Sequence, residues 1–167
     1  MKRQIDSTEL NFLYTKIGES IWHLQHVENN LATLILIKGI AKELNSLTES
    51  EALGHQKRLN KLTLGQLLGK TEKLDIIEPF LLKRIKSLNN ERKWIVHNSV
   101  TESGHELYTD TGRDFVFTKI LAFIDEAIAL NKLIGENIVE YGVSKGQSKE
   151  QIEVIAINHI NKLKGNA

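Results

Sequence analysis

Apolar residues recur at helical spacing along most of the chain, and they divide it into a series of predicted helices. In chain order these helices cover residues 7–44, a short stretch after Thr63, and residues 75–98, 113–141 and 148–163. The segments between them are rich in polar and turn-forming residues, and they are predicted to be loops or breaks: residues 45–62, 99–112 and 142–147. Ser148 and Gln151 have the spacing of a capping box, which marks the start of the last helix.

Composition agrees with this pattern. Hydrophobic residues make up 41% of the chain and charged residues 26%, and one proline and 11 glycines leave few points at which a helix must break. At 167 residues the chain is long enough to bury one substantial core. The sequence therefore predicts an all-α fold, an antiparallel helical bundle in a single domain over residues 1–167. This bundle has four main helices, a short helix and a C-terminal helix.

Several classes of protein are excluded or made less probable by the same composition. Cysteine is absent, which excludes disulfide scaffolds, zinc–thiolate sites and thiol nucleophiles. Residues 1–6 lack the apolar stretch of a secretory signal, and no window holds about 18 uninterrupted apolar residues. We therefore expect a cytoplasmic protein with no membrane partner. The net charge of +1 means that any attraction to phosphate must be local.

Two charged residues occupy positions at which the apolar stripes call for hydrophobic side chains. Glu28 interrupts the stripe of the first predicted helix, and Arg92 interrupts that of the helix over 75–98. A buried charge is costly unless it is paired and hydrogen-bonded. If both stripes face one core, Glu28 and Arg92 are partners; the alternative is that each side chain extends to solvent at the edge of its stripe.

His97 lies five residues after Arg92. On a regular α-helix this spacing leaves the two side chains ~140° apart, so they would not face one substrate. Either the helix ends or distorts near His97, or two copies of the chain combine their residues. Spacing alone also allows a histidine with a purely structural role.

The helix over 75–98 is rich in basic residues and includes one tryptophan. A basic face suits an RNA backbone, although charged helix faces are commonly just solvated. Trp94 could stack on a base, or it could belong to the core or an interface beside Ile95 and Val96. The basic residues are Lys83, Arg84, Lys86, Arg92 and Lys93.

The motif Arg92-x4-His97 resembles the Arg-x4–6-His signature of HEPN domains, a superfamily of helical proteins in prokaryotes and eukaryotes. The motif stands near the end of an amphipathic helix and is followed by Asn98, in a chain of suitable length and helix order. The region from Ile17 to Glu28 and the segment 64–67 are also similar to prokaryotic members. The resemblance covers residues 8–140, and its specific part is the Arg–His motif.

Many HEPN proteins are metal-independent endoribonucleases of toxin–antitoxin, abortive-infection and CRISPR-linked systems. The resemblance implies a homodimer in which two motifs form one composite site, an RNA substrate, and a partner protein such as an antitoxin or a defence complex. Carried over by position, Arg92 and His97 are the catalytic pair. His97 and its symmetry mate would act as base and acid, while Arg92 would stabilise the phosphate charge.

Three further residues are candidates for substrate binding or support of the catalytic pair. Lys93 departs from the family pattern, in which active members often have a small polar residue after the arginine; a lysine there could contact phosphate. Glu28 could orient Arg92 while leaving part of its guanidinium available. Asn98 could position substrate or cap the helix end. No metal or cofactor is expected. The rival hypothesis is a non-catalytic HEPN-like module that binds a partner protein or a nucleotide.

Overall fold

A computed structural model describes residues 3–43 and 45–164, without the side chains of His159, Lys162 and Leu163. These residues form helices and connecting turns, and no strand is present among them. The predicted all-α fold is therefore confirmed. No helix in this part of the chain is both long enough and apolar enough to cross a membrane.

The helices have the following bounds. The α-helices are α1 (Ser7–Leu34), α2 (Glu49–Leu59), α3 (Leu64–Leu74), α4 (Pro79–Lys93), α5 (Ser99–Ser103), α6 (Asp110–Ser144) and α7 (Lys149–Leu163). Two segments are π-helical and one is a 3-10 helix: η1 (Ile35–Ala41), η2 (Trp94–Asn98) and η3 (Gly104–Tyr108).

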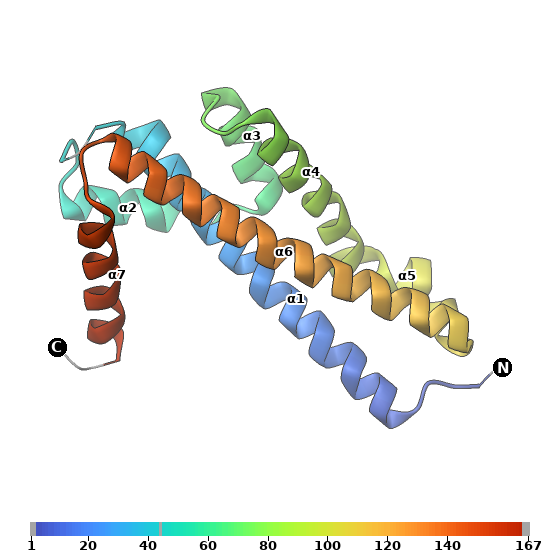
Figure 1. Cartoon of the computed structure of the whole chain (residues 1–167). Coiled ribbons are helices and arrows are strands. Elements are labelled where there is room, and N and C mark those ends of the chain that lie inside the picture. Colours follow the sequence, from blue (N-terminus) through green and yellow to red (C-terminus); the bar gives the residue numbers. More distant parts are fainter. Residues whose placement is uncertain (1–2, 44, 165–167) are drawn as a thin grey trace.

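Two long helices, α1 and α6, form the spine of the molecule (Figure 1). They run in the same direction, because Phe12 packs on Phe117 near their N-terminal ends and Asn30 bonds to Asn131 further along. This parallel pair differs from a simple antiparallel bundle, and it is possible because four α-helices, α2 to α5, lie between α1 and α6 in the chain and return it to the start of the spine. Helix α4 runs antiparallel to α6, and α3, α4 and α5 cover one side of the spine while α2 and α7 lie at its far end (Figure 1).

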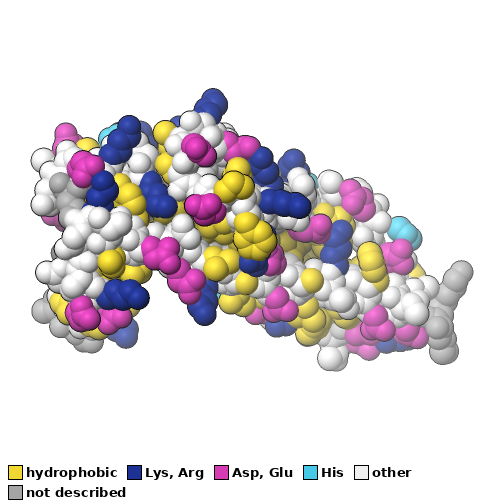
Figure 2. Space-filling model, turned by 45° about the horizontal axis from the view of Figure 1, so that its top comes forward, with side chains coloured by type: hydrophobic (Ala, Val, Ile, Leu, Met, Phe, Trp, Pro, Cys, Tyr) yellow, Lys and Arg dark blue, Asp and Glu magenta, His cyan; other side chains and the backbone are white. Residues whose placement is uncertain are grey.

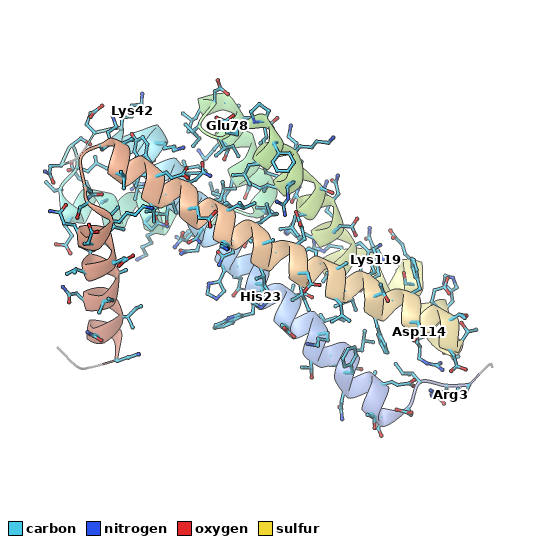
Figure 3. The ribbon with its side chains drawn as sticks, in the orientation of Figure 1. Arg3, His23, Lys42, Glu78, Asp114 and Lys119 are labelled. Atoms are coloured by element: carbon cyan, nitrogen blue, oxygen red, sulfur yellow. The ribbon has the colours of Figure 1, made fainter. Side chains whose placement is uncertain are left out.

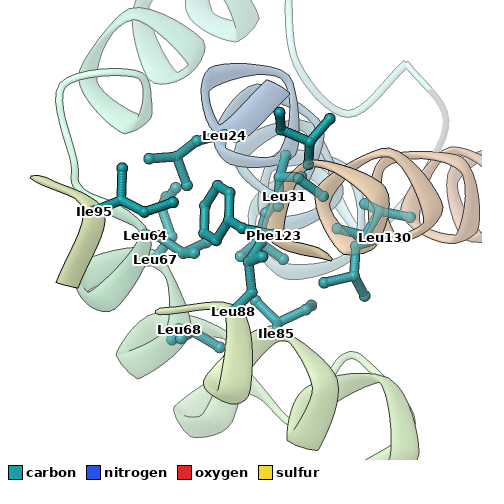
Figure 4. Packing of buried hydrophobic residues seen from close by; sticks show 14 of the residues in the cluster. Leu24, Leu31, Leu64, Leu67, Leu68, Ile85, Leu88, Ile95, Phe123 and Leu130 are labelled. Carbon is teal, nitrogen blue, oxygen red and sulfur yellow. The ribbon is translucent and has the colours of Figure 1, made fainter. Parts of the chain in front are cut away.

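The core lies between the spine and the α3–α4 pair. Its side chains come from all four helices, so that the apolar stripes predicted from the sequence meet in one cluster (Figure 4). Members from the four helices include Leu24, Leu31, Leu64, Leu67, Ile85, Leu88, Phe123 and Leu130. Burial of this apolar surface is the main term that holds α4, and with it Arg92, in place.

The predicted element boundaries need several corrections. Residues 45–62, predicted as a loop, contain α2. Only one residue of α2 is buried, so the helix lacks a clear apolar pattern, and its capping box of Thr48 and Glu51 went unrecognised. Residues 99–112 are α5 and η3 rather than a loop, and α6 begins earlier and ends later than predicted. Helix α4 begins at Pro79 and not at 75, because Asp75 is left-handed (φ 50°) and ends α3. Helix α3 and the Ser148–Gln151 cap of α7 are confirmed.

The first helix also differs from its prediction over 7–44. Its start is fixed by a capping box of Asp6 and Glu9, as the carboxylate of each accepts a backbone N–H of the other. The α-helix ends at Leu34 and continues as the π-helix η1, and the predicted end at Leu44 lies outside the described residues.

A buried arginine near the start of α6 is a feature that the hydrophobic pattern did not reveal. Arg113 is 1% exposed, and it donates hydrogen bonds to Glu9, to Asp110 and to the backbone carbonyl oxygens of Arg3 and Leu107. This set of acceptors offsets the cost of burying its charge. A hydrogen bond from Arg3 is the main reason that the pKa of Glu9 falls to about 2.

Candidate functional site

The Arg–His motif lies where α4 changes from an α-helix into the π-helix η2. Arg92 and Lys93 are the last two residues of α4, and His97 and Asn98 are the last two of η2. In a π-helix the hydrogen bonds run from residue i to i+5, so each turn holds more residues and each residue rotates by less. The ~140° between Arg92 and His97 on a regular α-helix is therefore reduced. Of the alternatives that the spacing left open, a distortion of the helix near His97 is observed.

The side chains of the motif differ in exposure. Lys93 and His97 are exposed, whereas Arg92 and Asn98 are half-buried. The side chain of Arg92 forms no hydrogen bond or ion pair with any of the described residues. Its guanidinium thus keeps its donors available at the edge of the core, and a rigid fork of this kind suits a phosphate or carboxylate.

Buried contacts on both sides of His97 fix the π segment. Trp94 and Ile95 are each 5% exposed and belong to the core. The indole N–H of Trp94 donates to Ser103 Oγ at 3.3 Å, and Lys119 Nζ lies 3.8 Å from the centre of the indole ring. The structure therefore supports the core interpretation of Trp94 and leaves no exposed ring face for stacking on a base. Lys119 comes from the stretch of α6 that passes α4 and α5 (Figure 3).

Glu28 does not form the predicted ion pair with Arg92 among the described residues. Its Oε1 instead accepts the backbone N–H of Leu64, the first residue of α3, at 2.8 Å. A carboxylate is a favourable partner for the unpaired N–H groups at a helix N-terminus, and this explains why Glu28 prefers that position. The arrangement removes a conflict in the prediction, because Arg92 is not occupied by Glu28.

Arg92 still acts on Glu28 through its charge. Burial raises the pKa of the half-buried Glu28 carboxyl, while the Leu64 hydrogen bond and the charge of Arg92 partly oppose that rise. Glu28 is therefore close enough to Arg92 to interact electrostatically without a direct contact. This geometry is compatible with an orienting role for Glu28 on α1.

Asn89 was missed by the sequence reasoning. It lies on α4 three residues before Arg92, and its side-chain amide is 3.5 Å from the position that a Cβ on Gly65, in the first turn of α3, would occupy. Its Oδ1 is buried and has no hydrogen-bond partner among the described residues. Asn89 and Glu28 thus both contact the start of α3, beside Arg92. The sequence could have pointed to Asn89, because it stands three residues before Arg92 and positions i and i+3 share a helix face.

Asn98 makes no capping hydrogen bond with its side chain, although it precedes α5. Its carbonyl oxygen accepts from Thr101 Oγ1 at 3.1 Å, and Ser99 Oγ donates to the carbonyl oxygen of Ile95 at 3.2 Å. Of the two predicted roles, capping by the side chain is therefore not observed. The amide of Asn98 remains available beside His97.

An apolar cavity of about 140 Å³ lies behind η2. Its lining includes Tyr14, Ile17, Trp94, Val100 and Ile120, and it offers almost no polar surface. A phosphate or a nucleobase would leave its hydrogen bonds unmade there. The chemistry of the site therefore belongs to the open surface around Arg92, Lys93 and His97. No group of three or more potential ligands that could hold a metal ion occurs in the described part of the chain.

Comparison of the chain with protein-family models, with curated proteins and with solved structures finds no match. The geometry of the motif and the resemblance of its sequence pattern are therefore the two indications of function.

Proposed function

We propose that this protein is a metal-independent endoribonuclease of the HEPN type, with Arg92 and His97 as its catalytic residues. The observation that carries the proposal is the π turn η2, which brings an exposed histidine toward the face of an arginine without an ion-pair partner among the described residues. π turns inside α-helices occur frequently at functional sites, since they expose backbone and side chains that a regular helix would place elsewhere.

The proposed reaction begins with attack of a ribose 2′-hydroxyl on the adjacent phosphorus. A base removes the 2′-proton, the O2′–P bond forms and the P–O5′ bond breaks, and an acid protonates the departing 5′-oxygen. The products are a 2′,3′-cyclic phosphate and a 5′-hydroxyl end. Histidine suits both proton transfers because its ordinary pKa is near neutral, and Arg92 stabilises the charge on the non-bridging oxygens. Lys93 adds a second positive charge.

The resemblance to HEPN proteins implies a dimer, and the geometry of this reaction gives that dimer a chemical role. The attacking and leaving oxygens lie on opposite sides of the phosphorus, so one imidazole cannot serve both at once. Each chain supplies one motif histidine, and a symmetric pair of chains supplies two. We therefore propose that His97 of one protomer acts as base while His97 of its partner acts as acid.

The direct test is cleavage of single-stranded and structured RNA in excess EDTA. Wild type should give cyclic-phosphate ends, and Arg92→Ala and His97→Ala should each reduce the rate by at least about 100-fold. His105→Ala is the matched control, because His105 is exposed on η3 and should retain full activity. Cleavage of an all-deoxy strand at the same rate would contradict the mechanism, since DNA lacks the attacking hydroxyl.

A mixing experiment tests the composite site. Wild type and His97→Ala are unfolded together, refolded at varied ratios, and assayed at constant total protein. If two histidines are required, activity should follow the square of the wild-type fraction, because mixed dimers are inactive. A linear dependence would show that each chain acts by itself.

The alternative function is a protein-interaction module, and α7 is the observation in its favour. This helix packs on the end of α6 and projects from the body of the molecule (Figure 1). It exposes about half of each of four apolar side chains, Val154, Ile155, Ile157 and Ile160. Exposed apolar side chains gathered in this way mark interaction sites. If wild type leaves every RNA intact, and its expression is not toxic to cells in a way that His97→Ala abolishes, this alternative is favoured.

A further inference from the structure

The outer face of α4 carries a row of polar residues that leads to the motif. The inner face is set by Leu81, Ile85 and Leu88, which are buried in the core. On the opposite side, residues recur at positions i, i+3, i+7 and i+10, the spacing of a single helix face. All four members are exposed, and we call them the α4 stripe: Lys83, Lys86, Asn90 and Lys93.

The α4 stripe points toward His97, which follows Lys93 by four residues. Continued as a regular α-helix, the same spacing would place His97 in line with the stripe. The smaller rotation of the π turn moves it from that line toward Arg92. His97 therefore lies between the α4 stripe and the arginine of the motif. From Lys83 to His97 the helix rises by about 21 Å, which is long enough for several consecutive phosphates.

Charge is unevenly divided between this part of the molecule and the rest. Residues 63–98 hold seven Lys or Arg and four Asp or Glu, a net charge of +3, although the whole chain carries only +1. Figure 2 shows Lys and Arg side chains over the upper part of the molecule, interspersed with Asp and Glu. Because the net charge of the chain is small, attraction to phosphate needs a local excess of positive charge. Such an excess is present beside the motif.

The ion pairs of the described residues leave the α4 stripe largely uncompensated. Lys86 is paired with Glu72 of α3. Lys83 and Lys93 form no ion pair with any residue that the structure describes. On the α6 side of the same helix, in contrast, Arg84 is paired with Glu126 at 2.8 Å. The unpaired charges are therefore on the side that faces solvent and leads to His97.

We propose that the α4 stripe binds the sugar–phosphate backbone of RNA and guides it to His97. The inference rests on the proposed ribonuclease function, whose substrate it places on the surface. Rows of Lys on a rigid helix bind phosphates without reading sequence, and they release counterions as they do so. The stripe therefore contributes to affinity for any single strand and leaves the choice of cleavage position to the site around Arg92 and His97.

Binding is measured separately from cleavage with a fluorescent RNA in which every 2′-hydroxyl is methylated. Fluorescence anisotropy gives its affinity for the full-length protein from 50 to 300 mM salt. The test variant is the double change Lys83→Gln and Lys93→Gln. Its control is Lys132→Gln with Lys149→Gln, which removes the same charge from exposed positions on α6 and α7.

The α4 variant should bind about tenfold more weakly at 100 mM salt, and its slope of log affinity against log salt should fall by about 1.4. The control variant should keep both the affinity and the slope of wild type. An all-deoxy strand of equal length should show the same pattern, because the phosphates are the same. Equal losses in the two double variants, or no loss in either, would overturn the proposal.

The cleavage assay then separates this proposal from the one on which it rests. With cleavable RNA the single change Lys83→Gln, which leaves Lys93 and the motif intact, should raise KM and leave kcat unchanged, since the stripe binds substrate and transition state alike. If methylated RNA binds through the α4 stripe and cleavable RNA stays intact, the stripe is upheld and the nuclease is rejected. If wild type cleaves and Lys83→Gln has an unchanged KM, the nuclease is upheld and the stripe is rejected.

Discussion

The two π-helical segments of this protein follow long α-helices in the same way, yet they present very different surfaces. Every residue of η1 is buried or half-buried, whereas η2 exposes Val96 and His97. In η1, Lys38 Nζ donates to the carbonyl oxygen of Ile76 at 3.2 Å, and Gly39 lies directly against Leu74. In η2 the buried residues come first and the exposed ones follow.

This comparison shows that a π turn does not by itself mark a functional site. The wider turn of η1 is filled by α3 and the segment after it, so it serves packing. The wider turn of η2 is anchored by Trp94 on its inner side and changes the direction of His97 on its outer side. A functional interpretation therefore depends on which side chains the turn exposes, and four predictions test that difference.

The largest expected effect is on the anchor of η2. Trp94→Ala should lower the free energy of unfolding by about 3–5 kcal/mol, because a large buried ring is replaced by a cavity. Trp22→Ala is the control, since Trp22 is 64% exposed and should change the stability by less than about 1 kcal/mol. Denaturant unfolding followed by circular dichroism measures both. Equal effects would mean that Trp94 does not anchor the π turn.

The next effect concerns the packing of η1. A Cβ at Gly39 would lie 2.6 Å from Leu74 Cδ1, so Gly39→Val should destabilise the protein by about 1–3 kcal/mol through overpacking. Gly18→Val is its counterpart on α1, where a Cβ would meet nothing within 4 Å, and the stability should stay constant or rise slightly. Cleavage per folded molecule should be unaffected by either change. A selective loss of cleavage in Gly39→Val would give η1 a role in function.

A smaller effect is expected from the cation that covers the anchor. Lys119→Met removes the charge that lies over the Trp94 ring and the 3.8 Å ion pair with Glu91. We expect a loss of about 0.5–1 kcal/mol in thermal or denaturant unfolding. Lys132→Met removes an equally charged side chain that is 78% exposed, and it should be neutral. If the two variants are indistinguishable, Lys119 contributes nothing to holding η2.

The smallest effect is a pH dependence that comes from Glu28. Because burial raises its pKa above the ordinary 4.5, the folded protein binds the Glu28 proton more tightly than the unfolded chain does. The stability that this provides is complete below pH 4.5 and is lost as the pH rises through the folded-state value. Glu28→Gln should therefore be at least as stable as wild type near neutral pH, with a flatter acid profile.

The same variant tests the orienting role of Glu28. A glutamine oxygen can still accept the Leu64 N–H, but it no longer provides a charge for Arg92. Cleavage should therefore fall while the stability does not. An unchanged cleavage rate would assign Glu28 to the start of α3 alone.

Much of the helical framework could be predicted from the sequence, and the reasons are visible in particular residues. The spacing of Leu81, Ile85 and Leu88 correctly placed one face of α4 in the core, and Ser148 with Gln151 correctly placed the start of α7. Helix α2 was missed because it is stabilised mainly by its caps and has little apolar periodicity, which is the signal that such predictions weigh most.

The candidate site was predicted less completely. Of the two alternatives for the charged residues Glu28 and Arg92, a direct ion pair or extension to solvent, the ion pair is not formed, although the charge of Arg92 still acts on Glu28. The sequence could not show that a backbone N–H of α3 competes for the Glu28 carboxylate, because α3 is 36 residues away along the chain. Arg113 and Asn89 were missed for the same reason, since their partners or neighbours come from other helices.

The sequence by itself therefore determined the all-α class, the core faces of the main helices and the residues of the Arg–His motif, because periodicity and short motifs are local properties of the chain. The tertiary structure decided that α1 and α6 run in parallel, that α4 ends in a π turn, and that Glu28 bonds to α3 while Arg92 does not bond to it. These features depend on contacts between distant segments, where packing around Trp94 and competition for hydrogen-bond donors override the regular α-helical count.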